Sequence, residues 1–179
     1  MASTPSASLK TSWSVRHPLP DVICNTSPFQ YLHQIGHLEL LPKLVSRIVV
    51  PTAVADELAE GRRRGLDLPI PEDLPWVDMR TPSSEQVVRL VADLGPGETG
   101  VLFLALERTD AVVILDDALA RRHAEMLGIS LTGTLGVLLD AKRRGLVSAL
   151  TPLIDDLQRL GFRLSDRTRQ AVLRKAAEL

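Results

Sequence analysis

The stretch of residues 112–122 joins a short apolar run to two acidic residues. Residues 112–115 are apolar and mostly β-branched, and Asp116 and Asp117 follow directly. Such a run is typical of a buried strand in a parallel sheet. Open parallel sheets bind their ligands outside the carboxyl ends of the strands. The two aspartates therefore predict a site at the end of this strand, and further polar residues are expected at the ends of neighbouring strands.

Other apolar runs alternate with helical patterns along the chain. Strands are predicted at residues 21–24, 47–50 and 129–131, with a short edge strand at 76–79. The first strand is followed by a predicted helix with Ser27 as N-cap and Pro28 at its first position. A further amphipathic helix is predicted over residues 83–94, and two helices end the chain. This alternation predicts an α/β fold with a parallel sheet covered by helices on both faces.

Composition excludes several classes of protein. The chain has 21 Lys and Arg against 22 Asp and Glu, so its net charge of -1 provides no overall attraction for nucleic acid, and any basic surface must be local. No run of about 18 apolar residues is present, as a membrane helix would need. The single cysteine, Cys24, cannot form an internal disulfide, which favours a cytoplasmic protein. We expect residues 1–20, rich in Ser, Thr and Pro, to be a mostly disordered tail, and residues 21–179 to form one domain.

Four predicted elements carry polar residues that the topology would bring to one crevice. Asn25 follows the first strand, Glu57 lies in the helix after the second, Glu98 opens a buried helix, and Asp116 and Asp117 end a later strand. Singly, these residues have ordinary explanations, as helix caps, dipole partners or solvated charges. Together, clustered carboxylates are tolerated mainly where a divalent cation compensates their repulsion. Oxygen ligands favour Mg²⁺ or Mn²⁺ over Zn²⁺.

Other common sites are not supported by the sequence. His33, His37 and His123 share no metal-ligand spacing. The segment Gly-Pro-Gly-Glu at 95–98 lacks the Lys-Ser/Thr pair of a Walker loop and the third glycine of a dinucleotide-binding loop. The sequence therefore indicates neither a zinc site nor a nucleotide site.

Five segments in order resemble the PIN-domain superfamily. They are NTSP at 25–28, VVPTAVADEL at 49–58, GPGETG at 95–100, VVILDDALAR at 112–121 and GTLGVLLDAKRRGL at 133–146. The chain is similar, more narrowly, to a bacterial PIN-like branch that carries the glycine-glutamate and twin-aspartate motifs. The resemblance covers about residues 22–175 and implies a three-layer α/β/α fold with a central parallel sheet of about four or five strands and C-terminal helices.

The same resemblance implies a function. Many relatives are toxin ribonucleases of toxin–antitoxin pairs, so it implies a cytoplasmic enzyme whose partners are RNA and a small antitoxin protein, with a homodimer as a further possibility. It implies Mg²⁺ or Mn²⁺ held by Glu57, Glu98 and Asp116, with or without Asp117, and assisted by Thr26, Ser27 or Thr134. A water activated by the cation would attack an RNA phosphodiester in line, and a second cation would stabilise the leaving oxygen.

One departure from the family pattern concerns Asn25. The first acidic residue of PIN nucleases falls on this position, where the neutral amide offers an oxygen ligand but no charge. The branch often carries Asn here. Two functions therefore stay open: a metal-dependent ribonuclease that acts as a toxin, and a catalytically weak or inactive PIN-like module that binds RNA or a protein.

Because the net charge is near zero, RNA phosphates must be neutralised by local basic clusters. The predicted phosphate contacts are Arg62, Arg63, Arg64, Arg121, Arg122, Lys142, Arg143 and Arg144. For the second group, from Arg121 onward, solvated helix ends are an equally good explanation, because cations are favourable at helix C-termini in any case.

Overall fold

The computed structural model describes residues 21–45, 47–83 and 93–179. The predicted tail at 1–20 and most of the predicted helix at 83–94 lie outside these residues. No helix in the described ranges is long and apolar enough to cross a membrane.

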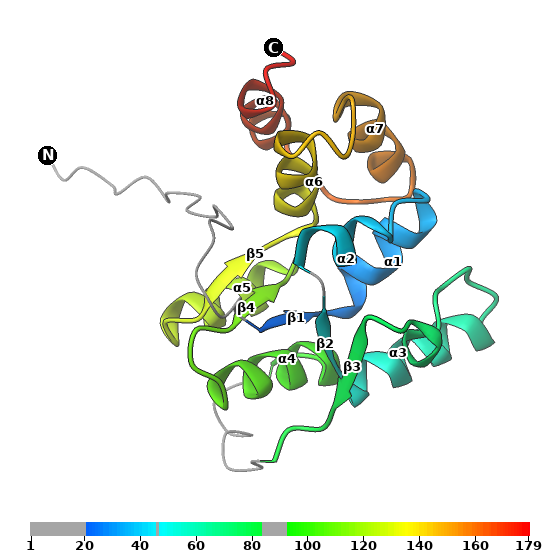
Figure 1. Ribbon diagram of the computed structural model, residues 1–179, viewed down its shortest axis with the longest axis vertical. Coiled ribbons are helices and arrows are strands. Elements are labelled where there is room, and N and C mark those ends of the chain that lie inside the picture. The colour runs from blue at the N-terminus through cyan, green and yellow to red at the C-terminus, as the bar shows by residue number, and fades with distance from the viewer. Residues whose placement is uncertain (1–20, 46, 84–92) are drawn as a thin grey trace, which may run out of the picture.

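A five-stranded, all-parallel sheet forms the centre of the protein (Figure 1). Its strands are β1 (Val22–Cys24), β2 (Ile48–Pro51), β3 (Val77–Arg80), β4 (Val112–Ile114) and β5 (Ser130–Thr132). Their order is β3-β2-β1-β4-β5, with β1 paired to β2 through Ile23 and Val49, and to β4 through Ile23 and Val113. β1 and β2 are completely buried, because parallel strands in such a sheet are covered on both faces.

Helices flank the sheet, so the predicted α/β fold with three layers is confirmed. They are α1 (Thr26–Gln34), α2 (Leu40–Val45), α3 (Thr52–Arg63), α4 (Pro96–Leu106), α5 (Ala118–Met126), α6 (Thr134–Arg143), α7 (Thr151–Arg159) and α8 (Asp166–Lys175), with a short 3-10 helix at Pro71–Asp73. Helix α4 packs on β1, β2 and β4. It is apolar nearly all round and buried along most of its length, as its sequence predicts.

The chain enters α1 earlier than predicted. The helix begins at Thr26 with Asn25 as its N-cap, so the assignment of Ser27 as N-cap is wrong. The backbone N–H of Asn25 still donates to the carbonyl of Ile114 at 3.2 Å, so the chain passes from strand to helix within one residue. Pro28 falls in the first turn, where a missing N–H costs no intrahelical hydrogen bond.

β1 is the strand from which the sheet grows in both directions. The chain passes from β1 to β2 and β3 on one side, whereas β4 and β5 add to the other side. Such a reversal of strand order opens a crevice at the carboxyl ends of the two central strands, which is where ligands bind in open parallel sheets. Asn25 and Asp116 follow the two strands that meet there.

Candidate metal centre

Asn25 is fully buried at the end of β1 and bridges to α4. Its side-chain amide donates to Oε1 of Glu98 at 3.1 Å. Its carbonyl oxygen Oδ1 is buried and has no hydrogen-bond partner among the described residues. A buried polar atom left in this state costs about 1–3 kcal/mol unless something else satisfies it. An amide oxygen without a donor is a suitable ligand for a hard cation.

Glu57 connects three helices at the same point. Its Oε1 accepts the backbone N–H of Gly97 at 2.8 Å, and its Oε2 accepts the hydroxyl of Thr26. Gly97 lies in the first turn of α4, where N–H groups have no intrahelical partner and the helix dipole favours a carboxylate. Glu57 is therefore held from both sides, by the starts of α1 and α4.

The absence of a side chain at Gly97 keeps a space open between these oxygens. A Cβ at this position would lie 2.5 Å from Oε2 of Glu57 and 2.9 Å from Oδ1 of Asn25. A Cβ at Gly95 would likewise lie 2.5 Å from Oε2 of Glu98. The two glycines thus leave room around an amide oxygen and two carboxylates, and this donor set fits Mg²⁺ or Mn²⁺.

Asp116 is held separately, at the end of β4. Its Oδ1 accepts the backbone N–H of Thr134 at 2.8 Å and its Oδ2 accepts the Thr134 hydroxyl at 2.5 Å. Burial raises the pKa of Asp116, and the bonds from Thr134 and the charge of Arg121 reduce that rise. The neighbouring Asp117 is exposed and caps α5, where its Oδ1 accepts the N–H groups of residues 119 and 120 at 2.9 Å each.

The predicted site residues thus form three hydrogen-bonded pairs, which are Asn25–Glu98, Thr26–Glu57 and Asp116–Thr134. The first two pairs lie side by side, because Asn25 and Thr26 are neighbours in the chain and Glu57 also accepts the N–H of Gly97, next to Glu98. Ser27 lies in the first turn of α1. Among the described residues, no three His, Cys, Asp or Glu side chains gather in a group that could hold a metal ion. The candidate centre therefore consists of two carboxylates and an amide, with Asp116 on the adjacent strand.

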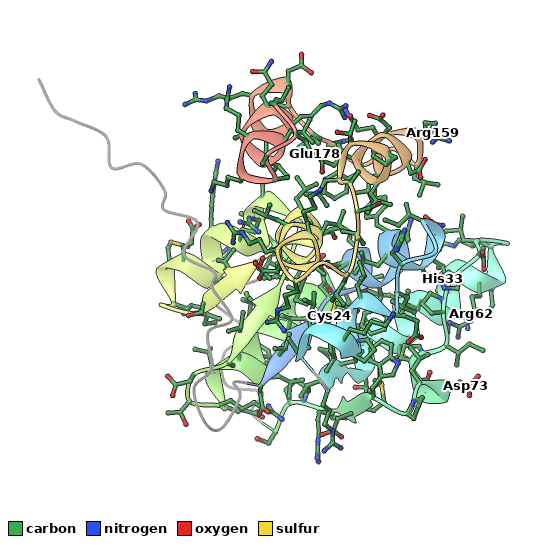
Figure 2. All side chains as sticks on the ribbon, turned by 45° about the horizontal axis from the view of Figure 1, so that its top comes forward. Cys24, His33, Arg62, Asp73, Arg159 and Glu178 are labelled. Atoms are coloured by element: carbon green, nitrogen blue, oxygen red, sulfur yellow. The ribbon has the colours of Figure 1, made fainter. Side chains whose placement is uncertain are left out.

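The predicted RNA-binding arginines at the end of α3 already have partners within the chain. Arg62 donates to the carbonyl of Pro69 at 2.5 Å. Arg63 and Arg64 both pair with Glu60, at 2.5 and 2.9 Å. Figure 2 shows Arg62 at the periphery, whereas Cys24, which directly precedes Asn25, lies near the middle of the molecule.

Most residues of the second predicted basic group, from Arg121 onward, also have partners within the chain. Arg121 donates to two backbone carbonyls, at 2.8 and 3.2 Å, which join the ends of β4 and β5. Lys142 pairs with Glu178 at 3.3 Å, Arg143 pairs with Asp140 at 3.3 Å, and Arg144 donates to the carbonyl of Leu44 at 3.0 Å. Arg122 is exposed.

The residues that sequence reasoning missed are the glycines. Gly97 shapes the space around Glu57 and Asn25, and a Cβ at Gly133 would lie 2.8 Å from Oδ1 of Asp116. Their place in the sequence could have indicated them, because Gly97 directly precedes Glu98 and Gly133 directly precedes Thr134. Glycine at such positions often marks a close approach of other atoms to the backbone.

Comparison with known proteins identifies one family. A family model described as a PIN domain matches residues 21–178. No curated protein and no solved structure matches the chain. The matched range contains all five strands and every residue of the candidate centre.

Proposed function

Since the chain belongs to the PIN-domain family and has its nuclease-type fold, we propose that it is a ribonuclease that depends on a divalent metal ion. PIN domains generally use divalent metal ions. One observation carries the proposal: Oδ1 of Asn25 is buried without a donor among the described residues, beside a carboxylate oxygen of Glu57 and a space that Gly97 leaves open. A cation in that space would satisfy all of these oxygens.

Asn25, Glu57 and Glu98 would hold the cation, and Mg²⁺ or Mn²⁺ would supply activation of water and neutralisation of charge on the phosphodiester. The chain's own hydrogen bonds orient these ligands before any metal binds. Thr26 and the N–H of Gly97 orient Glu57, and the Asn25 amide orients Glu98. Such fixed ligand orientation is typically worth 10–100-fold in metal affinity or activity. Asp116, oriented by Thr134, adds a carboxylate at the end of the adjacent strand.

The test is RNA cleavage by the purified full chain in Mn²⁺, in Mg²⁺ and in EDTA. We expect cleavage only with a cation, and a loss of about 100-fold in Glu98→Gln, which keeps the size of the side chain but removes its charge. The matched control is Glu125→Gln, the same change on an exposed residue of α5. Equal cleavage by Glu98→Gln and the wild type, or cleavage in EDTA, would contradict the proposal.

The second candidate function is a module that binds RNA or a protein without cutting. It is favoured by the neutral amide at Asn25 and by the absence, among the described residues, of a metal-binding group with three acidic, His or Cys members. RNA binding without cleavage in either cation would identify this function. Calorimetry with Mn²⁺ separates the two further, because the ribonuclease must bind the cation whether or not RNA is present.

We also propose that the protein acts in the cytoplasm as the toxin of a toxin–antitoxin pair. The support is the likeness of its motifs to those of toxin ribonucleases. Expression in a bacterial host should arrest growth, Glu98→Gln should abolish the arrest, and co-expression of a small protein encoded beside it should relieve it. Unchanged growth with an active ribonuclease would remove the toxin role and leave the enzymatic one.

A further inference from the structure

The basic side chains of the chain divide into two classes. Most of those in the described residues donate to carboxylates or carbonyls of the chain itself, as Arg63, Arg64 and Lys142 do. Within the same ranges, the basic residues with neither an ion pair nor a hydrogen bond are Lys43, Arg122, Arg163, Arg167, Arg174 and Lys175. The last four fall within residues 163–175. A cation that is paired with a carboxylate is already partly neutralised before it meets a phosphate, whereas a free cation offers its full charge.

This C-terminal segment is also the most basic part of the chain. Residues 163–175 contain five Arg and Lys and one acidic residue, Asp166, in a chain whose net charge is only -1. Arg169 is the basic member with a partner, Asp155 at 2.8 Å. The excess of positive charge is therefore local, and along Arg163, Arg167, Arg174 and Lys175 it is not neutralised by the described part of the chain.

Helix geometry directs this charge outward. Arg167 and Arg174 are seven residues apart and share one face of α8, because an α-helix has 3.6 residues per turn. Val172 and Ala176, on the opposite face, are buried against the rest of the protein. Arg167, Arg174 and Lys175 are exposed. The outer face of α8 is thus a basic strip.

The residue before this segment packs on α1, the helix that begins beside the candidate centre. The chain between α7 and α8 passes α1, where Phe162 packs edge to face on Tyr31 with ring centres 5.0 Å apart (Figure 1). Burial and the charge of Asp116 raise the pKa of Tyr31, and the charge of Arg163 lowers it. Tyr31 lies in α1, the helix that begins directly after Asn25, and Arg163 directly follows Phe162. The ring contact therefore places the start of the basic segment beside α1.

We infer that Arg163, Arg167, Arg174 and Lys175 form the surface that binds the RNA phosphate backbone and lead it past Tyr31 toward the start of α1, where the candidate centre lies. This inference rests on the proposed ribonuclease function, because it takes RNA as the substrate. Free cations release condensed counterions from RNA when they bind it, and this release dominates backbone affinity. Arg62, Arg63 and Arg64, which the sequence pattern favours, are instead held by Pro69 and Glu60.

The test measures RNA binding and not cleavage. A labelled single-stranded RNA is titrated in EDTA across a salt series, with fluorescence anisotropy as the readout. The variant is Arg167→Gln/Arg174→Gln/Lys175→Gln, and the matched control is Arg62→Gln/Arg63→Gln/Arg64→Gln, which removes the same charge. We expect the slope of log K against log salt to fall by about 2 in the α8 variant, at about 0.7 per lost contact, with a roughly tenfold or greater rise in Kd. Arg163→Gln alone should lower the slope by about 0.7. The control should keep the wild-type slope.

Three outcomes would overturn the inference: a wild-type slope in the α8 variant, a loss of slope in the control instead, or no RNA binding by the wild type. An unchanged RNA slope together with lost binding to polyglutamate would assign α8 to an acidic protein partner. Melting of the α8 variant should match the wild type, because the three side chains are exposed and unpaired in the described structure. Failure of the ribonuclease proposal is distinguishable, since it would show as intact α8-dependent binding without cleavage in Mn²⁺.

Discussion

The side-chain amide of Asn25 donates a hydrogen bond to the carboxylate of Glu98, with Nδ2 3.1 Å from Oε1. Asn25 is fully buried, and its other polar atom has no partner among the described residues. The amide at this position is a neutral donor to Glu98, whereas a second carboxylate there would repel it. The residue that departs from the acidic pattern is therefore also the residue that holds an acidic neighbour in place.

Asn25→Asp should make the metal-free protein less stable near neutral pH, by about 2–3 kcal/mol, because a hydrogen bond to a charged group is replaced by repulsion. Saturating Mn²⁺ should recover the loss, since a ligand that binds only the folded state stabilises it by mass action. Thermal melts with and without Mn²⁺, and calorimetry, measure both effects. Asn25→Ala is the control that loses the donor without adding charge. An unchanged melt and an unchanged Mn²⁺ affinity in Asn25→Asp would place Asn25 outside any metal site.

Gly97→Ala should destabilise the protein by about 1–3 kcal/mol, because the added methyl group would overlap Oε2 of Glu57 and Oδ1 of Asn25. Helix propensity alone predicts the opposite sign, a gain of about 1 kcal/mol for alanine over glycine. Urea denaturation decides between them. The control is Gly61→Ala in α3, where the new methyl group meets mainly the flexible end of Leu68. Equal responses of the two variants would show that the space at Gly97 is not restricted.

Thr134→Val should lower the free energy of unfolding at pH 7 by about 1.5–3 kcal/mol, because it removes a hydroxyl donor from a half-buried carboxylate. Thr134→Ser, which keeps the hydroxyl, should restore most of the lost stability. Burial raises the pKa of Asp116 above its unfolded value. Its protonated form therefore adds stability that is fully present below the unfolded pKa and is lost as pH rises through the folded one. The deficit of the valine variant should accordingly shrink in acid. Melts of the three proteins from pH 3 to pH 8 test this, and a deficit independent of pH would contradict it.

Glu178 ties the C-terminus of the described chain to the start of α7 (Figure 2). Partial burial raises the pKa of Glu178, but bonds from Thr151, Leu150 and Lys142 outweigh burial and hold it at about 2, below the ordinary 4.5. The stability that Glu178 contributes to the folded state is therefore present above about pH 4.5 and is lost as pH falls toward 2. Glu178→Gln should lower the melting temperature at pH 7 by about 2–4 °C, on the order of a lost helix cap. The difference from wild type should vanish near pH 2, and Glu125→Gln should show none.

The sequence by itself determined the elements and the edge of the sheet at which the site lies. Apolar runs such as residues 112–115 and the all-round apolar helix after Gly97 are local patterns, and burial of such patterns is favourable in almost any compact arrangement. The parallel sheet then follows from their alternation. It also places Asn25 and Asp116 at the carboxyl ends of their strands, whereas the pairing of those strands, β1 with β4, is a feature of the folded chain.

Only the tertiary structure decided which polar groups meet. The contacts of Glu57 with Thr26 and Gly97 cross 31 and 40 residues of sequence, and that of Asn25 with Glu98 crosses 73. Such contacts depend on how helices dock on the sheet, to within the length of one hydrogen bond, and no local periodicity encodes that. The same holds for charge, because Glu60 pairs with Arg63 and Arg64 while the outer face of α8 keeps its cations free among the described residues. A run of arginines is visible in the sequence, but whether it is already neutralised depends on side-chain positions that only the folded chain defines.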